Sequence, residues 1–375
     1  MVIETVSIYR VAMPLVYPFR TSFGDTDVVE GVLVKMADGE CVGWGEATPW
    51  AAPLYSAEWA GGAYAVLRDW LAPAILGQQV DSGDELQEIL SPFKGNFFAK
   101  SALDLAWWDL EARRRCQPLW RLLGGLSDTA EVGADFGVME SIEALLDAIA
   151  RAVDAGFTRV KLKIRTGWDV NVLRAVREVF PETMFHVDAN SGYRLQDVAL
   201  FQALDEYRLA MIEQPLGHDD LLDHAQLQKV LRTPICLDES VTSVDRAVQA
   251  IELGACRWIN IKPGRVGGLT PALRILRAAE KANVPCWIGG MLESSVGSSH
   301  CQALATLPNV KYPSDVFPSR RFYAHDLGCF ERELSGPSQI RAFEGPGIGC
   351  VPDEGRLRAS TIESCSLCVD SVSVN

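Results

Sequence analysis

The chain has 375 residues, a formal net charge of −14 at pH 7, 48% hydrophobic residues and 22% charged residues. This composition is typical of a globular protein, and the length suits a large domain accompanied by a smaller one. The acidic charge argues against nucleic acid or an anionic membrane surface as the partner, because both select for clustered Lys and Arg. No apolar run reaches membrane-spanning length and residues 1–10 lack a signal-peptide pattern, so we expect a cytoplasmic protein with no membrane partner.

Residues 1 to about 50 have the alternating pattern of antiparallel strands, with a turn at residues 37–39. Residues 18–26 (PFRTSFGDT) lie between two of these strands, and their polar, Gly-containing composition predicts a mobile loop. Residues 56–125 have a helical pattern, which is clearest over residues 99–115, where apolar residues recur at helical spacing before a basic end. We therefore expect an α+β domain over residues 1–125.

From residue 132 to about residue 311, apolar strand patterns alternate with helical patterns in seven or eight units. Such alternation predicts a parallel sheet. The equal spacing of the units favours a closed barrel over a doubly wound sheet, and no G-x-G-x-x-G sequence opens a helix. We expect the barrel domain over residues 126–315, followed by a Gly- and Pro-containing segment, residues 316–375, that folds back on the first domain.

Cysteine usage gives no sign of a second site. Ten cysteines are dispersed along the chain, and we interpret them as reduced thiols of a cytoplasmic protein. Cys365 and Cys368 form one isolated C-x-x-C pair in a Ser-rich stretch, which is weak evidence for metal or redox chemistry. We interpret that stretch as a tail.

Five ionisable residues close successive apolar runs of the barrel region at intervals of 25, 25, 25 and 24 residues: Lys163, Asp188, Glu213, Asp238 and Lys262. This interval matches one strand, one helix and two short loops. Because the C-terminal ends of the strands of a parallel barrel surround a single mouth, the spacing predicts one site with three carboxylates between two lysines. A single such Asp would more commonly cap a helix, but the register of all five argues against that interpretation.

Three carboxylates in a partly buried mouth would repel one another unless a cation neutralised them. Oxygen ligands without His or Cys favour Mg²⁺ over Zn²⁺, and Mg²⁺ leaves coordination positions open for a substrate carboxylate. Lys161 and Lys163 lie two residues apart and so share a strand face, and we expect them, with Lys262 and Arg265, to depress one another's pKa. A free lysine amine could then act as a general base on a carbon next to a carboxylate.

The motifs that contain these residues resemble those of a known protein family. The patterns K-x-K at Lys161, D-A-N at Asp188, E-Q-P at Glu213, D-E-S at Asp238 and K-P-G-R-V-G-G at Lys262 are similar to those of the muconate-lactonising branch of the enolase superfamily. The resemblance covers nearly the whole chain. It implies a modified (β/α)7β TIM barrel with an α+β capping domain, and a Mg²⁺-dependent lyase or isomerase, with Mn²⁺ or Co²⁺ able to substitute, acting through an enediolate on a small-molecule carboxylate.

Within that branch, local segments most resemble o-succinylbenzoate synthases and N-succinylamino acid racemases. The resemblance implies Asp188, Glu213 and Asp238 as metal ligands and Lys163 as the base. Lys262 would stabilise the enediolate in the dehydration, which would serve menaquinone assembly, or return a proton from the other face in the racemisation. It further implies that Arg265 tunes Lys262, that the protein forms homo-oligomers, and that Lys161, Asn190 and Glu239 support the site. Substrate contacts would come from Phe19, Phe23, Tyr55, Asp135, Gly290, Met291 and Phe322.

Asp135 departs from the family pattern, because relatives with racemase activity usually carry a small hydroxyl residue at this position. Strand alternation places Asp135 on the same face as Gly133 and Gly137. We expect its carboxylate to repel a succinyl carboxylate, or to pair with Lys161 and raise the pKa of that lysine.

Other functions remain open from the sequence. A muconate cycloisomerase of the same branch is compatible with the pattern. A dipeptide epimerase is less so, because such enzymes carry a D-x-D near the last strand, where this chain has Asp315 alone. Sugar-acid dehydratases use a His-Asp pair where this chain has Lys262, and a non-catalytic binding protein would have no reason to carry all five charged residues.

Overall fold

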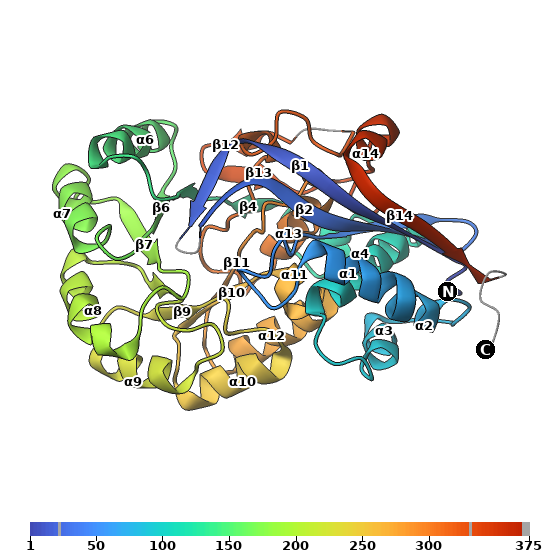
Figure 1. Cartoon of the computed structure of the whole chain (residues 1–375), viewed down its shortest axis with the longest axis horizontal. Helices are drawn as coiled ribbons and strands as arrows, with labels where there is room; N and C mark the ends of the chain where they lie inside the picture. Colours follow the sequence, from blue (N-terminus) through green and yellow to red (C-terminus); the bar gives the residue numbers. More distant parts are fainter. Residues whose placement is uncertain (22–23, 330–331, 370–375) are drawn as a thin grey trace.

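The N-terminal part of the chain forms a curved antiparallel sheet packed on helices (Figure 1). The computed structural model describes residues 1–21, 24–329 and 332–369. The sheet has the strand order β14-β1-β2-β3. Its strands are β1 (Thr5–Thr21), β2 (Gly24–Ala37), β3 (Val42–Ala47) and β14 (Thr361–Cys368). The helices are α1 (Ala60–Val66), a π-helical turn (Leu67–Leu71), α2 (Ala72–Ile75), α3 (Gly83–Leu90), α4 (Phe97–Arg114) and α5 (Leu119–Leu122).

The sheet and helix α4 approach each other closely because β3 contains two glycines. A Cβ atom on Gly45 would lie 2.2 Å from the carbonyl oxygen of Ala102, and one on Gly43 would lie 2.3 Å from the carbonyl oxygen of Ala106. No side chain fits at either position, so these glycines set the distance between sheet and helix. The distance matters for the site, since residues just after β3 reach the mouth of the barrel.

The structure corrects the prediction of a mobile loop at residues 18–26. Phe19 pairs with Thr26 and Thr21 pairs with Gly24, so β1 and β2 continue as a hairpin through most of this segment. Polar and Gly-rich composition indicated a loop, whereas cross-strand pairing extends the strands beyond their apolar part. Residues 22 and 23 lie outside the described part of the chain.

The expected barrel is present. Seven parallel strands lie in the order β11-β10-β9-β8-β7-β6-β5, and helices cover their outer side (Figure 1). The strands are β5 (Ala134–Phe136), β6 (Arg159–Lys163), β7 (Met184–Asp188), β8 (Ile212–Glu213), β9 (Ile235–Leu237), β10 (Trp258–Ile261) and β11 (Cys286–Ile288). The helices are α6 (Ile142–Asp154), α7 (Val170–Val179), α8 (Val198–Leu204), α9 (Leu222–Val230), α10 (Val244–Leu253), α11 (Pro263–Val266), α12 (Leu269–Lys281) and α13 (Ser295–Ala305).

Residues 310–315 close the barrel between its first and last strands. Val310 forms a parallel bridge with Cys286 on one side, and Ser314 forms a parallel bridge with Val132 on the other. The backbone N–H of Asp315 donates to the carbonyl of Ile288 at 2.9 Å. This segment therefore serves as the eighth strand of a (β/α)7β barrel, and it carries the side chain of Asp315 to the barrel mouth.

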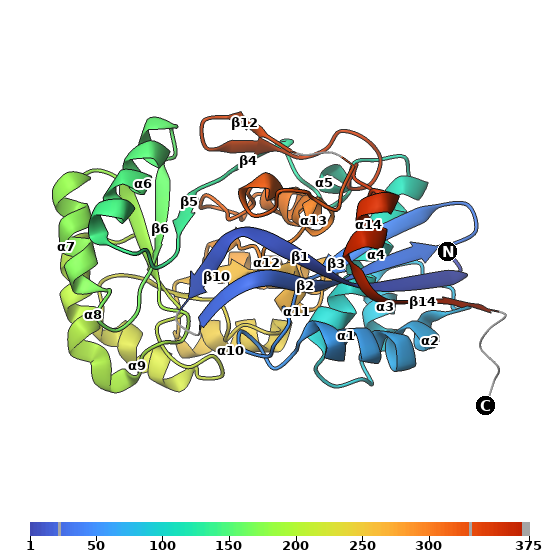
Figure 2. The ribbon, with the colours of Figure 1, turned by 45° about the horizontal axis from the view of Figure 1, so that its top comes forward.

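The C-terminal segment returns across the N-terminal sheet (Figure 2). After β12 (Leu334–Gly336), β13 (Gln339–Arg341) and α14 (Glu354–Ser360), strand β14 pairs with β1, with Thr5 opposite Cys368. Cys365 and Cys368 thus lie in an ordered edge strand, so the interpretation as a tail was wrong. Residues three apart on a strand point to opposite faces, and the two thiols therefore do not form one site.

No helix within residues 1–21, 24–329 and 332–369 combines the length and the apolar character that crossing a membrane would need.

Candidate active site at the barrel mouth

The strand register brings the predicted ionisable residues to one end of the barrel. Lys163, Asp188 and Glu213 are successive partners across β6, β7 and β8. Asp238 and Lys262 directly follow β9 and β10. All five side chains are buried, with exposed fractions of 7% or less. The equal spacing in sequence therefore corresponds to adjacent strand ends in space.

The backbone at these strand ends is unusual. Asn190 has φ 41°, Gln214 has φ 37° and Leu292 has φ 61°, and all three are non-glycine residues in the left-handed region. Such conformations are unfavourable by about 1–3 kcal/mol each and persist only where surrounding contacts enforce them. Here the side chain of Gln214 contributes, since its carbonyl oxygen accepts the N–H of Asp238 at 3.0 Å. The Gln214 side chain thus helps to hold the chain in the turns at these strand ends.

Lys163 lies on one side of the mouth, against an acid and an amide. Its Nζ donates to Oδ2 of Asp188 at 2.9 Å and to Oδ1 of Asn190 at 2.7 Å. Nδ2 of Asn190 donates in turn to Oε1 of Glu239 at 3.3 Å. Burial raises the pKa of Glu239 to about 7, and the nearby charge of Asp188 adds to the rise. Asn190 therefore connects Lys163, the predicted base, to Glu239, whose pKa is about 7.

Lys262, which follows β10, makes a similar contact with an acid. Its Nζ is 2.8 Å from Oδ2 of Asp238 and 4.6 Å from the centroid of the Tyr55 ring. Oδ1 of the same carboxylate accepts hydrogen bonds from Arg265 and from the hydroxyl of Tyr55. Arg265 thus contacts Lys262 through their shared partner, Asp238.

Glu213 is oriented by groups beneath the mouth. Nδ2 of Asn260 donates to its Oε1 at 2.6 Å, while Nε2 of His186 and Nζ of Lys161 lie 3.5 and 3.6 Å from its Oε2. Burial alone would raise the pKa of Glu213, but the charge of Lys161 and the contact with His186 outweigh it and hold the pKa well below its usual range. Glu213 is therefore ionised despite its complete burial.

Asp315 is a central residue that the sequence analysis left without a role in the site. Its Oδ2 lies 2.6 Å from Nζ of Lys161, and its Oδ1 accepts a hydrogen bond from Nη2 of Arg159 at 2.8 Å. Arg159 is fully buried and stacks on the rings of Trp287 and Tyr312. These residues form the floor of the site, which we call the Arg159–Asp315–Lys161 floor.

The predicted depression of lysine pKa values is wrong for Lys161 and Lys262. Burial lowers the pKa of Lys161, but the carboxylates of Asp315 and Glu213, and to a lesser extent Asp135, raise it well above its ordinary value. Burial and the charge of Lys161 lower the pKa of Lys262, but Tyr55 and Glu213 raise it. The net result is a pKa above the ordinary value. The carboxylates around each amine raise its pKa more than the neighbouring cations lower it.

The donor set suits a hard divalent cation. Oε2 of Glu213 and Oδ2 of Asp238 are buried and lie in ion-pair contact without an aligned hydrogen-bond donor among the described residues. Carboxylate oxygens on neighbouring strand ends are the ligand type that Mg²⁺ selects. As they stand, no group of three or more His, Cys, Asp or Glu side chains in the described ranges has the arrangement needed to hold a metal ion. The residues fit the ion chemically, and binding would require the carboxylates to turn from their lysine partners.

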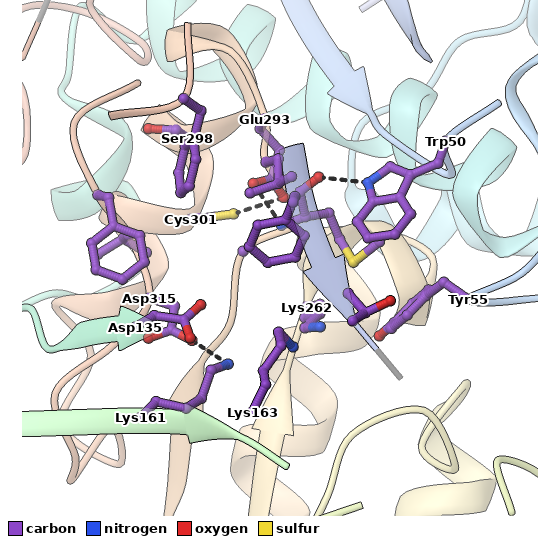
Figure 3. Close-up of a pocket in the computed structure, with 18 of the residues that line it drawn as sticks. Trp50, Tyr55, Asp135, Lys161, Lys163, Lys262, Glu293, Ser298, Cys301 and Asp315 are labelled. Atoms are coloured by element: carbon purple, nitrogen blue, oxygen red, sulfur yellow. Dashed lines mark hydrogen bonds and ion pairs between the residues drawn. The ribbon is translucent and has the colours of Figure 1, made fainter. Parts of the chain in front are cut away.

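A cavity of about 50 Å³ lies above these groups, between the barrel and the curved sheet (Figure 3). Six of the predicted substrate contacts line it: Phe19, Tyr55, Asp135, Gly290, Met291 and Phe322. The seventh, Phe23, lies outside the described residues. In Figure 3, Lys163 and Lys262 point into this cavity from neighbouring positions, and Asp135 lies beside Asp315.

Several wall residues were not predicted from the sequence, namely Trp50, Glu293, Ser298, Cys301 and Phe317. Trp50 has φ 71° and its indole N–H donates to the carbonyl of Met291 at 3.1 Å, joining the N-terminal sheet region to the loop after β11. Trp50 follows Pro49 at the end of a strand pattern, and nothing in this local sequence indicates a role in the site. Glu293, by contrast, closely follows Gly290 and Met291, which the resemblance implied as substrate contacts.

Known proteins share this fold and align with most of this sequence. Residues 3–124 match the family model of the mandelate racemase / muconate lactonizing enzyme N-terminal domain, and residues 144–356 match that of the enolase C-terminal domain-like family. The chain belongs to the enolase superfamily, as the sequence predicted. Enzymes of this superfamily are Mg²⁺-dependent.

Among curated proteins, the chain is 44% identical to an o-succinylbenzoate synthase from Geobacillus stearothermophilus, over 96% of both chains. It is 43% identical to an N-succinylamino acid racemase from Thermus thermophilus, over 92% of this chain and 94% of that protein. A crystal structure of an enolase-superfamily member from Listeria innocua superimposes with a TM-score of 0.95 at 35% identity and covers 98% of this chain and 100% of that one.

Proposed function

We propose that the protein removes the proton α to a carboxylate, and that it acts as an N-succinylamino acid racemase, an o-succinylbenzoate synthase, or both. The observation that carries this proposal is the placement of two lysines. Lys163 ends β6, Lys262 follows β10, and both amines enter the same cavity beside a carboxylate. Two amines on different strands can serve two faces of one carbon.

In the proposed assignment, Asp188, Glu213 and Asp238 hold Mg²⁺, for which Mn²⁺ or Co²⁺ can substitute. When bound there, Mg²⁺ supplies positive charge that favours loss of a proton next to a carboxylate. Lys163 takes the α-proton. Lys262 donates a proton to the opposite face in the racemisation. In the syn-dehydration it stays cationic and stabilises the enediolate charge, and the protonated Lys163 gives its proton to the departing hydroxyl, which leaves as water from the same face.

The remaining polar residues support these roles. Arg265 binds the same carboxylate as Lys262, so it keeps positive charge beside that lysine and sets its orientation. Asn190 positions Lys163, and Glu239 holds Asn190. The high pKa of Lys161, which is buried among Asp315, Glu213 and Asp135, favours a permanent cation rather than a base.

The Arg159–Asp315–Lys161 floor argues against a dipeptide epimerase. Such an enzyme needs an acid free to bind the substrate ammonium group. Asp315 is the acid at the corresponding place, but Arg159 and Lys161 already neutralise it, at 2.8 and 2.6 Å. A muconate cycloisomerase remains the alternative within the branch, and no contact in the site favours it.

The test is α-deuterium exchange into N-succinylphenylalanine, alongside a dehydratase assay that follows o-succinylbenzoate formation, each with Mg²⁺ and with EDTA. We expect exchange, turnover or both with Mg²⁺, and loss of the activity in EDTA with recovery on adding Mg²⁺ back. Neither exchange nor turnover with Mg²⁺ present would refute the proposal. Isothermal titration of Mg²⁺ into the wild type and Glu213→Gln, with loss of binding expected in the variant, tests the ligand assignment separately.

Self-association and a cytoplasmic location stay predictions. Sedimentation at several protein concentrations would test the first, and fractionation of cells producing the protein would test the second.

A further inference from the structure

The cavity at the barrel mouth adjoins a second, larger one. The outer cavity has a volume of about 430 Å³, against about 50 Å³ for the inner one. Three residues line both: Phe19, Asp135 and Phe322. We call these three residues the neck. Because the inner cavity has room for only a few water molecules, a ligand whose reacting carbon lies beside Lys163 and Lys262 must extend through the neck.

The outer cavity suits the distal part of such a ligand. Its wall is largely apolar, with contributions from Pro18, Phe136, Val138, Met139 and Ala144. Arg20 and Arg321 also line it. The guanidinium of Arg321 stacks on the ring of Phe317, 4.3 Å from its centroid, and donates to the main-chain carbonyl of Asp135. This contact fixes the backbone of the neck.

Asp135 is the hydrogen-bonding side chain of the neck, since the other two members are phenylalanines. Its Oδ1 is buried and, among the described residues, has no hydrogen-bond donor. The adjacent cation does not supply one: Lys161, its register partner on β6, forms ion pairs with Asp315, Glu213 and Asp188 but none with Asp135. A buried carboxylate oxygen without a donor is unfavourable, and a ligand that brings an N–H to this point relieves the deficit.

We propose that Asp135 accepts a hydrogen bond from the amide N–H beside the α-carbon of an N-acylamino acid, and thereby selects amide substrates over o-succinylbenzoate-type ligands. This inference rests on the proposed function of the site. In an N-acylamino acid, the amide directly follows the reacting carbon, which places its N–H at the neck when that carbon lies beside the lysines. o-Succinylbenzoate offers only acceptor oxygens and a ring there. A site built around a donor rejects the analogue that lacks it, because its own polar group stays unpaired.

The experiment compares the binding of an amide, its ester analogue and o-succinylbenzoate. Dissociation constants are measured by isothermal titration, in Mg²⁺, for N-succinylphenylalanine, for the ester analogue in which oxygen replaces the amide N–H, and for o-succinylbenzoate. We expect the wild type to bind the amide at least tenfold more tightly than the ester. In Asp135→Ala, the amide-to-ester ratio should fall to near one, and o-succinylbenzoate should bind several-fold more tightly than to the wild type.

Glu140→Ala is the matched control, because Glu140 also lines the outer cavity but is 84% exposed at its side chain. It removes the same charge and should leave the amide-to-ester ratio unchanged. A ratio near one in the wild type, which needs no variant to fold, would overturn the inference, as would the wild-type ratio in Asp135→Ala. If α-deuterium exchange still occurs, only the role of Asp135 fails. If there is neither exchange nor dehydration, the proposed function fails as well.

Discussion

The Arg159–Asp315–Lys161 floor should be sensitive to the loss of its single acid. The side chains of Arg159, Lys161 and Asp315 are 0%, 5% and 6% exposed. Asp315→Asn keeps the shape of the side chain but removes the carboxylate that pairs with buried Arg159, and it leaves Lys161 with only its longer contacts to Asp188 and Glu213, at 3.5 and 3.6 Å. Breaking a buried ion pair by removing one partner destabilises a protein by about 3–5 kcal/mol, because the remaining charge is desolvated and uncompensated. We expect a loss of unfolding free energy in this range.

The assay is urea-induced unfolding at pH 7, followed by circular dichroism. Asp84→Asn is the control, because Asp84 forms an ion pair of the same length with Arg274, at 2.6 Å, but with side chains 67% and 42% exposed. Such a surface pair contributes no more than about 1 kcal/mol. Equal midpoints for the two variants would refute the reasoning, since they would mean that burial adds nothing to the pairing of Asp315.

Two further predictions concern the contact between the N-terminal sheet and the barrel. Burial raises the pKa of Glu46 from 4.5 to about 7. Its carboxylate accepts hydrogen bonds from the N–H groups of Ser294 and Gly297. Between these two pH values the folded protein binds one proton more than the unfolded chain. The unfolding free energy of the wild type should therefore fall by about 3 kcal/mol from this group as pH rises from 4.5 to 7. Glu46→Gln should lack this part of the pH dependence. Parallel unfolding midpoints for the two proteins between pH 4.5 and 8 would contradict this. Gly45→Ala should destabilise by several kcal/mol because its methyl meets the α4 backbone at 2.2 Å, whereas Gly336→Ala, with its nearest atom 3.5 Å away, should be tolerated in the same unfolding assay.

Part of the site could be predicted from sequence because a barrel repeats. Each strand–helix unit has nearly the same length, so a spacing of 25 residues keeps Lys163, Asp188 and Glu213 at corresponding strand ends. The apolar runs that they close predict the strands, because a strand buried on both faces is apolar throughout. At these residues the apolar pattern of each strand and the alignment of the strands in the barrel lead to the same placement.

Other features depend on contacts that no local pattern contains. Asp315 joins the site because residues 310–315 close the barrel, which brings it against Arg159 and Lys161 from far along the chain. The direction of the lysine pKa shifts depends on how many acids surround each amine, and this count follows from the folded structure. The hairpin near Phe19 depends on cross-strand pairing rather than composition.

The central claim is that Lys163 and Lys262 serve opposite faces of one α-carbon. The most direct test measures α-deuterium exchange into the separate L and D enantiomers of N-succinylphenylalanine by Lys163→Ala and Lys262→Ala, with Mg²⁺ present and folding checked by circular dichroism. If the two lysines serve opposite faces, each variant loses exchange with one enantiomer, by about 10²-fold or more, and retains it with the other, in opposite senses. Exchange of both enantiomers at the wild-type rate by either variant, or loss of the same enantiomer in both, would contradict it.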